Sequence, residues 1–136
     1  MRFMRNESGA SAVEFAMLLP VFLTIIFGIV VFGSYLTMVH GVQQLAAEAA
    51  RTSIAGLNDS ECNSLATSYV TTNLGSYPLL DATKVSVTAA PSGADANIYI
   101  VTVQYDASSD FIFALPFTPR LPFPITRSAV IPYGGF

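Results

Sequence analysis

The chain has 136 residues, of which 52% are hydrophobic and 11% are charged, and its formal net charge is −3. Its six Lys and Arg residues form no cluster, which argues against nucleic-acid binding, since neutralising phosphates requires grouped basic side chains. The single cysteine, Cys62, rules out an intramolecular disulfide. We expect Cys62 to be a small buried residue, with intermolecular pairing as the alternative.

A long apolar run follows a short basic start. Arg2 and Arg5 precede the run, and no charged residue occurs between Glu14 and Glu48. At ~1.5 Å per residue, residues 15–38 form a helix of about 36 Å, enough to cross a ~30 Å hydrocarbon core. The alternative is a cleaved secretory signal, whose apolar part is normally about 7–15 residues. The length of the run predicts a single membrane span instead.

Basic residues flank this span unevenly. Arg2 and Arg5 lie on its short N-terminal side, whereas the nearest basic residue on the other side is Arg51. The positive-inside rule therefore places the N-terminus in the cytoplasm and the rest of the chain outside it.

Glu14 stands at the start of the span, between Val13 and Phe15. A carboxylate at full depth costs about 2.5–3.5 kcal/mol, and less near the interface. A helix that served only as an anchor would gain nothing from it. Glu14 is therefore a functional candidate, and the alternative is an interfacial carboxylate that stays solvated.

The residues around Glu14 carry a family resemblance. Gly9 is followed by ASAVEF, which looks like a prepilin peptidase site: a basic leader ends in Gly and the fifth mature residue is Glu. The wider string GASAVEFAMLLPVFLTIIFGIVVFG resembles the TadE-like family of the tight-adherence (Tad, Flp) pilus system. The resemblance is strongest over residues 5–55, with a weaker echo in LPFPITRSAVIPYGG near the end.

The resemblance implies a cytoplasmic leader, residues 1–9, that a prepilin peptidase removes between Gly9 and Ala10. It also implies a place in the bacterial inner membrane, with other pilin or pseudopilin subunits and an inner-membrane assembly platform as partners. Phe15 stands where the major fimbrial subunit more often has Tyr, and the part after the helix is far larger than that subunit's. Both departures indicate a minor component.

A physical argument for this site stands beside the resemblance. Cleavage would free the α-amine of Ala10, one helical turn from Glu14. A poorly solvated amine and carboxylate stabilise each other far more than they would in water. Glu14 of one subunit would then pair with the Ala10 amine of the next.

Residues 10–56 are predicted to form one long helix that continues beyond the membrane. Pro20 removes a helical hydrogen bond and predicts a bend. Gly33, Thr37 and Gly41 recur at four-residue spacing and offer a groove for close helix packing, unless they are small residues without a partner. Gly56 is expected to end the helix in the left-handed conformation.

Residues 57–136 are predicted to form one small α+β domain. Asn58 and Glu61 resemble a capping box that starts a second helix, which Gly75 closes. An apolar stripe at helical spacing predicts its buried face. The stripe comprises Leu65, Ala66, Tyr69, Val70 and either Asn73 or Leu74.

Beyond Pro78 the apolar period changes to two. Residues 85–89 and 99–105 alternate in polarity around a turn-rich segment, which predicts an antiparallel hairpin. A third strand is expected at residues 125–131, between Pro124 and Pro132. The predicted fold class is therefore α+β and pilin-like, with a three-stranded antiparallel sheet.

Residues 111–124 hold four Phe and four Pro and are predicted to form an extended loop. Two interpretations stay open. Phe111, Phe113 and Phe117 close the core of the small domain, or these residues with Phe123 form a docking surface for another subunit or for the outer leaflet.

Catalytic chemistry finds little support in the sequence. There is one histidine, His40, and no metal-ligand spacing, phosphate-binding loop or nucleophile set. We therefore predict no enzyme, cofactor or metal, and a minor pilin or pseudopilin. The alternatives are an unprocessed single-span scaffold of an inner-membrane complex and a membrane-tethered binding module that uses the Phe/Pro-rich loop.

Overall fold

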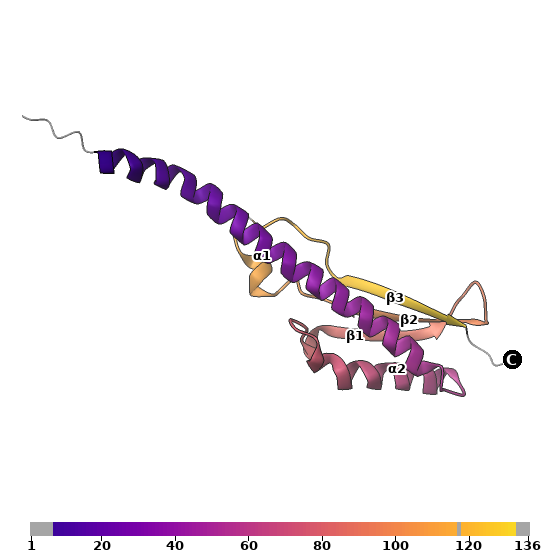
Figure 1. Cartoon of the computed structure of the whole chain (residues 1–136). Coiled ribbons are helices and arrows are strands. Elements are labelled where there is room, and N and C mark those ends of the chain that lie inside the picture. The colour runs from indigo at the N-terminus through magenta and orange to yellow at the C-terminus, as the bar shows by residue number, and fades with distance from the viewer. Residues whose placement is uncertain (1–6, 117, 133–136) are drawn as a thin grey trace, which may run out of the picture.

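The computed structural model describes residues 7–116 and 118–132. Its helices are α1 (Glu7–Ser53) and α2 (Asp59–Asn73), and its strands are β1 (Val85–Pro91), β2 (Ile98–Tyr105) and β3 (Ile125–Pro132). Figure 1 shows α1 projecting far beyond the sheet, with only its C-terminal half beside the other elements. The predicted α+β arrangement of a long N-terminal helix, a second helix and a three-stranded antiparallel sheet is confirmed.

Helix α1 is one continuous helix of 47 residues, and Figure 1 shows it gently curved. It begins at Glu7, so Ser8 and Gly9 of the predicted leader are helical, while residues 1–6 lie outside the described part of the chain. The helix stays intact at Pro20, where the Thr24 hydroxyl donates to the Pro20 carbonyl oxygen at 2.8 Å.

The end of α1 corrects the prediction made for Gly56. The helix ends at Ser53, and the φ of Gly56 does not lie in the left-handed range. A Cβ on Gly56 would lie 2.7 Å from both the backbone nitrogen and Sγ of Cys62. Gly56 is therefore required by the close approach of α2, which sequence spacing does not reveal.

Helix α2 begins with the predicted cap. The backbone N–H of Glu61 donates to Asn58 Oδ1 at 2.9 Å, and the Leu57 N–H donates to the Glu61 carboxylate at 2.8 Å. The helix ends at Asn73, and a short 3-10 turn, Leu74–Ser76, follows it. The fully buried residues of this helix and turn are Cys62, Ala66, Val70 and Leu74.

The buried face of α2 thus follows the predicted stripe. Leu65, Tyr69 and Asn73 lie at its margin, half-buried. The prediction that Cys62 is buried is confirmed, because the residue is 1% exposed.

The sheet has the order β1-β2-β3, with both pairs antiparallel, and the predicted hairpin and third strand are confirmed. Helix α1 packs on β2 and β3, and α2 packs on β1. The side chains of β2 that face these helices are buried: Tyr99, Val101, Val103 and Tyr105. The other face of the sheet is open and carries polar side chains at its centre, where Thr102 and Ser128 share a hydrogen bond of 2.9 Å.

Two buried tyrosines tie the strands to the preceding segments. The Tyr99 hydroxyl donates to the Asp59 carbonyl at 3.1 Å, next to the start of α2. The Tyr105 hydroxyl donates to the Leu79 carbonyl at 3.2 Å and accepts from the Asp81 N–H at 3.2 Å. Burial raises the pKa of Tyr105, so the hydroxyl stays protonated and can donate.

Candidate functional site

Within the described part of the chain, the N-terminal half of α1 has no buried side chain before Val31. All side chains of residues 8–27 are exposed, and Val31 is the first that is fully buried. The most apolar 18-residue window of the helix has a mean hydropathy of 2.8, and the helix is long enough to cross a membrane. Burial of this surface must come from something other than the chain's own domain.

The predicted processing residues lie in the first turns of α1. Gly9 and Ala10 are exposed and helical, and an added Cβ on Gly9 would meet nothing within 4 Å. Glu14 is also exposed and lies one turn beyond Ala10. Among residues 7–116 and 118–132, no side chain forms an ion pair with Glu14. The neighbouring Phe15 is 65% exposed.

The three small residues predicted to form a packing groove have different surroundings. Gly41 is buried, and a Cβ there would lie 3.2 Å from Leu80 Cδ1 and 3.4 Å from Tyr77 Cδ1. Its smallness therefore serves packing within the chain. Gly33 and Thr37 are exposed, and the Thr37 hydroxyl donates to the Gly33 carbonyl at 2.8 Å.

An aromatic cluster fixes the Phe/Pro-rich loop to α1. The Tyr35 and Phe123 rings meet edge-on with centroids 5.8 Å apart, and the Phe113 and Phe123 centroids are 5.0 Å apart. The Tyr35 hydroxyl also donates to the Pro122 carbonyl at 3.5 Å. Phe113 and Phe123 thus pack against the core, with their side chains half-buried.

The expectation that Phe111 closes the core is wrong, since its side chain is 78% exposed. Phe111 starts a short 3-10 turn, Phe111–Ala114, so the loop is not extended throughout. Phe117, the third residue predicted for the core or for docking, lies outside the described residues.

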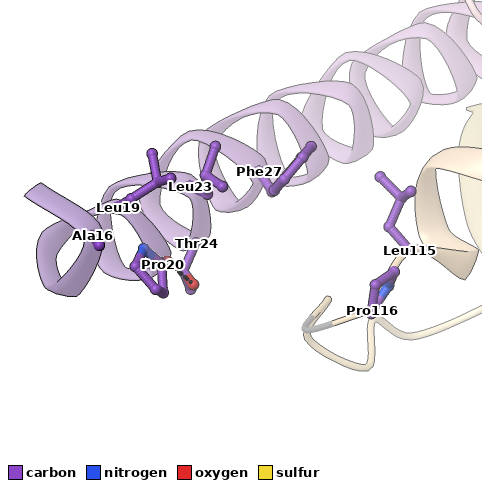
Figure 2. A pocket seen from close by; sticks show the side chains of 8 residues that line it. All are labelled: Ala16, Leu19, Pro20, Leu23, Thr24, Phe27, Leu115 and Pro116. Carbon is purple, nitrogen blue, oxygen red and sulfur yellow. Dashed lines mark hydrogen bonds between the residues drawn. The ribbon is translucent and has the colours of Figure 1, made fainter. Parts of the chain in front are cut away.

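An apolar groove of about 480 Å³ separates this loop from α1. In Figure 2, Leu115 and Pro116 stand across an open gap from the helix. The wall on the helix side comprises Ala16, Leu19, Pro20, Leu23, Thr24 and Phe27. The groove therefore lies beside the apolar part of α1 that the domain does not cover.

Sequence reasoning missed two groups that hold the loop. Tyr35 is 87 positions from its hydrogen-bond partner Pro122, so no local pattern connects them. In the sequence, Asp110 looks like one of several scattered surface carboxylates. In the structure it forms an ion pair with Lys84, just before the loop begins. This pairing raises the pKa of Lys84, mainly through the hydrogen bond to Asp110.

The described residues offer no group of three His, Cys, Asp or Glu side chains that could hold a metal ion. His40 is exposed on α1. Burial, reinforced by the nearby Asp59 and Glu61, raises the pKa of Cys62 and so disfavours its thiolate.

Comparison with known families bears on the N-terminal helix. The family model described as TadE-like protein matches residues 9–51. The predicted resemblance is confirmed over this stretch, which covers nearly all of α1. The match covers about a third of the chain, and it suggests a link to the Tad pilus system. The comparisons with curated proteins and with solved structures give no match.

Proposed function

We propose that the protein is a minor pilin or pseudopilin of a tight-adherence pilus. A prepilin peptidase cuts it after Gly9, and it assembles with other pilin-like subunits through α1. The observation that carries this proposal is the bare N-terminal half of α1, where residues 8–27 are exposed and Glu14 is one turn from Ala10. The TadE-like match begins at residue 9 and supports the same assignment.

The geometry suits both steps. Gly9 lies within three residues of the start of α1, where helices fray, and glycine weakens a helix by about 0.5–1 kcal/mol relative to alanine. The peptide bond after Gly9 is therefore at the part of α1 that opens most readily for a protease. After cleavage, the Ala10 amine and the Glu14 carboxylate supply opposite charges at the start of a helix segment that is otherwise mainly apolar.

In this function α1 crosses the inner membrane once, with its N-terminus in the cytoplasm and the sheet domain outside. Partners are the prepilin peptidase, pilin or pseudopilin subunits and the inner-membrane assembly platform. Residues Gly33 and Thr37, exposed above the bare segment, extend the surface available to a neighbouring helix.

The test is the intact mass of the membrane-extracted protein, expressed with and without a cognate prepilin peptidase. We expect peptidase-dependent loss of residues 1–9 and its suppression by Gly9→Ala. Gly28→Ala is the matched control, because both glycines lie in α1 and neither would bring a Cβ within 4 Å of another group. An uncut wild-type chain in the presence of active peptidase would favour the unprocessed scaffold.

Assembly is tested separately with the cleaved protein. Glu14→Gln removes the charge while keeping the size, so we expect it to abolish cross-linking between subunits or incorporation into filaments. Glu14→Asp retains the carboxylate and should keep part of the activity. Equal assembly of wild type and Glu14→Gln would show that the Glu14 carboxylate is not needed for assembly.

A further inference from the structure

We propose that the tip of the Phe/Pro-rich loop, Leu115 and Pro116, is embedded in the outer leaflet of the membrane that α1 crosses. Phospholipid acyl chains then fill the groove between this tip and α1. The inference rests on the membrane-spanning role of α1 in the proposed function, but not on cleavage or filament assembly.

The position of the membrane along α1 follows from two limits. A span placed at residues 15–38 would draw into the hydrocarbon Val31, which is fully buried, and Met38, which belongs to the domain core. A span shifted toward the start of the chain would draw Arg5 and Glu7 into it. A segment of about 20 residues that ends near Val31 satisfies both limits.

This position sets the depth of the groove. All of its helix residues precede Val31, and the last of them is Phe27. Four residues at ~1.5 Å each place Phe27 about 6 Å below Val31 along the helix. The helix wall continues from Phe27 to Ala16, about 22 Å below Val31. Leu115 stands beside the Phe27 end of this wall (Figure 2), so the loop tip lies roughly 5–10 Å below the outer interface, the depth typical of interfacial apolar elements.

The chemistry of the loop suits that depth. Leu115 and Pro116 present apolar surface, and the prolines of the loop have no N–H that lipid would leave unpaired. The single hydroxyl hydrogen of Thr118 is shared between the Leu115 carbonyl oxygen at 2.8 Å and the Phe113 carbonyl oxygen at 3.2 Å. The Thr118 hydroxyl and the Leu115 and Phe113 carbonyls are thus paired within the loop.

Charges are kept away from the tip. Asp110, before the loop's 3-10 turn, is paired with Lys84. Arg120, on the returning limb, is exposed and has a side chain long enough to reach lipid phosphates from just below the interface. The loop is therefore a wedge, with Leu115 and Pro116 as its apolar end and with Asp110 and Arg120 at its polar base.

Lipid fits the groove better than the helix of a second copy. Close helix packing requires small residues along a continuous seam. Here the smaller residues Ala16, Pro20 and Thr24 alternate with the bulky Leu19, Leu23 and Phe27 on the helix side, and among the described residues the opposite wall consists of Leu115 and Pro116. Flexible acyl chains adapt to a short, wide groove of this kind.

The chain has no tryptophan, so a single introduced tryptophan reports its own surroundings. We would reconstitute the full-length, uncleaved Leu115→Trp protein at low protein-to-lipid ratio in phosphatidylcholine/phosphatidylglycerol vesicles. Half of the preparations would contain lipids brominated on the acyl chain. Leu57→Trp is the solvent control, because Leu57 is 88% exposed beyond the far end of α1, and Phe22→Trp on the bare helix reports insertion.

We expect blue-shifted emission from Leu115→Trp, with about half or more of it quenched by bromines in the upper part of the acyl chain. Leu57→Trp should instead be quenched by aqueous acrylamide. If Leu115→Trp behaves like Leu57→Trp, the wedge is refuted, and the span itself still stands if Phe22→Trp is quenched by bromine. A Phe22→Trp that bromine does not quench would refute both.

A blue shift at Leu115→Trp that bromine does not affect, and that disappears on dilution with lipid, would show a second protein copy in the groove and refute the lipid assignment. Circular dichroism checks folding, and Pro116→Trp replaces Leu115→Trp if that variant does not fold. Because no peptidase is present, the result does not depend on processing.

Discussion

Gly56 shows how one residue can be located correctly by sequence and explained incorrectly. A glycine after a long helix suggests a left-handed cap, yet here the close approach of Cys62 excludes any larger residue. The constraint joins the turn after α1 to the first turn of α2. It thereby fixes the angle at which the second helix returns along the first.

We predict that Gly56→Ala lowers the free energy of unfolding by about 1–3 kcal/mol, because the new methyl group overpacks against the Cys62 backbone. Gly75→Ala is the control: a Cβ at Gly75 would meet nothing within 4 Å, and we expect a change of at most about 1 kcal/mol, in the stabilising direction. Thermal unfolding in detergent, followed by circular dichroism, measures both. Equal melting temperatures of Gly56→Ala and wild type would contradict the contact.

At the scale of elements, the two halves of the continuous helix α1 have different surroundings. From Tyr35 onward it supplies the core with an apolar stripe that packs on the sheet and α2. Before Val31 it presents apolar side chains in every direction, as expected of a segment surrounded by lipid or other helices. The Phe/Pro-rich loop is attached at the junction between these parts, through Tyr35 and Phe123.

The two ends of this loop are predicted to differ in their contribution to stability. Phe123→Ala removes a half-buried ring from the cluster with Tyr35 and Phe113, so we expect a loss of about 2 kcal/mol. Phe111→Ala, at a side chain that is 78% exposed, should change stability by about 0.5 kcal/mol or less. Thermal melting gives the stabilities, and limited proteolysis reports release of the loop in Phe123→Ala. Equal losses for both variants would show that the cluster does not anchor the loop.

At the scale of the whole molecule, folding and membrane attachment use separate parts of the chain. The core cluster draws on α1 only from Tyr35 onward, and all its other members come from α2, the sheet and the connecting segments. Residues 8–27 add exposed surface and no buried side chain. The domain should therefore be able to form without them.

We accordingly predict that residues 31–136 alone form a folded, cooperatively melting domain. A shorter piece, residues 46–136, should fail to do so because it lacks Met38, Val42 and Leu45, all at most 2% exposed. Circular dichroism and the width of the thermal transition distinguish the two cases. Loss of cooperative melting in the longer piece would mean that the bare part of α1 stabilises the domain.

Much of the fold could be predicted because its signals are local. The period-two alternation of residues 99–105 corresponds to β2, whose buried residues are those of the predicted face. The Asn58 cap corresponds to the observed start of α2. For the candidate site, the basic leader, Gly9 and Glu14 led to the TadE-like family, and the match to residues 9–51 confirms that resemblance.

The sequence by itself determined the elements with a regular apolar period, the apolar segment and its resemblance to the TadE-like family, because these depend on residues near one another in the chain. Only the tertiary structure decided what happens between distant segments: the pairing of Tyr35 with Phe123, the contact of Gly56 with Cys62, and the return of the Phe/Pro-rich loop beside α1. The physical reason is that side-chain packing has no sequence period. It depends on which surfaces remain to be buried once the helices and the sheet have met.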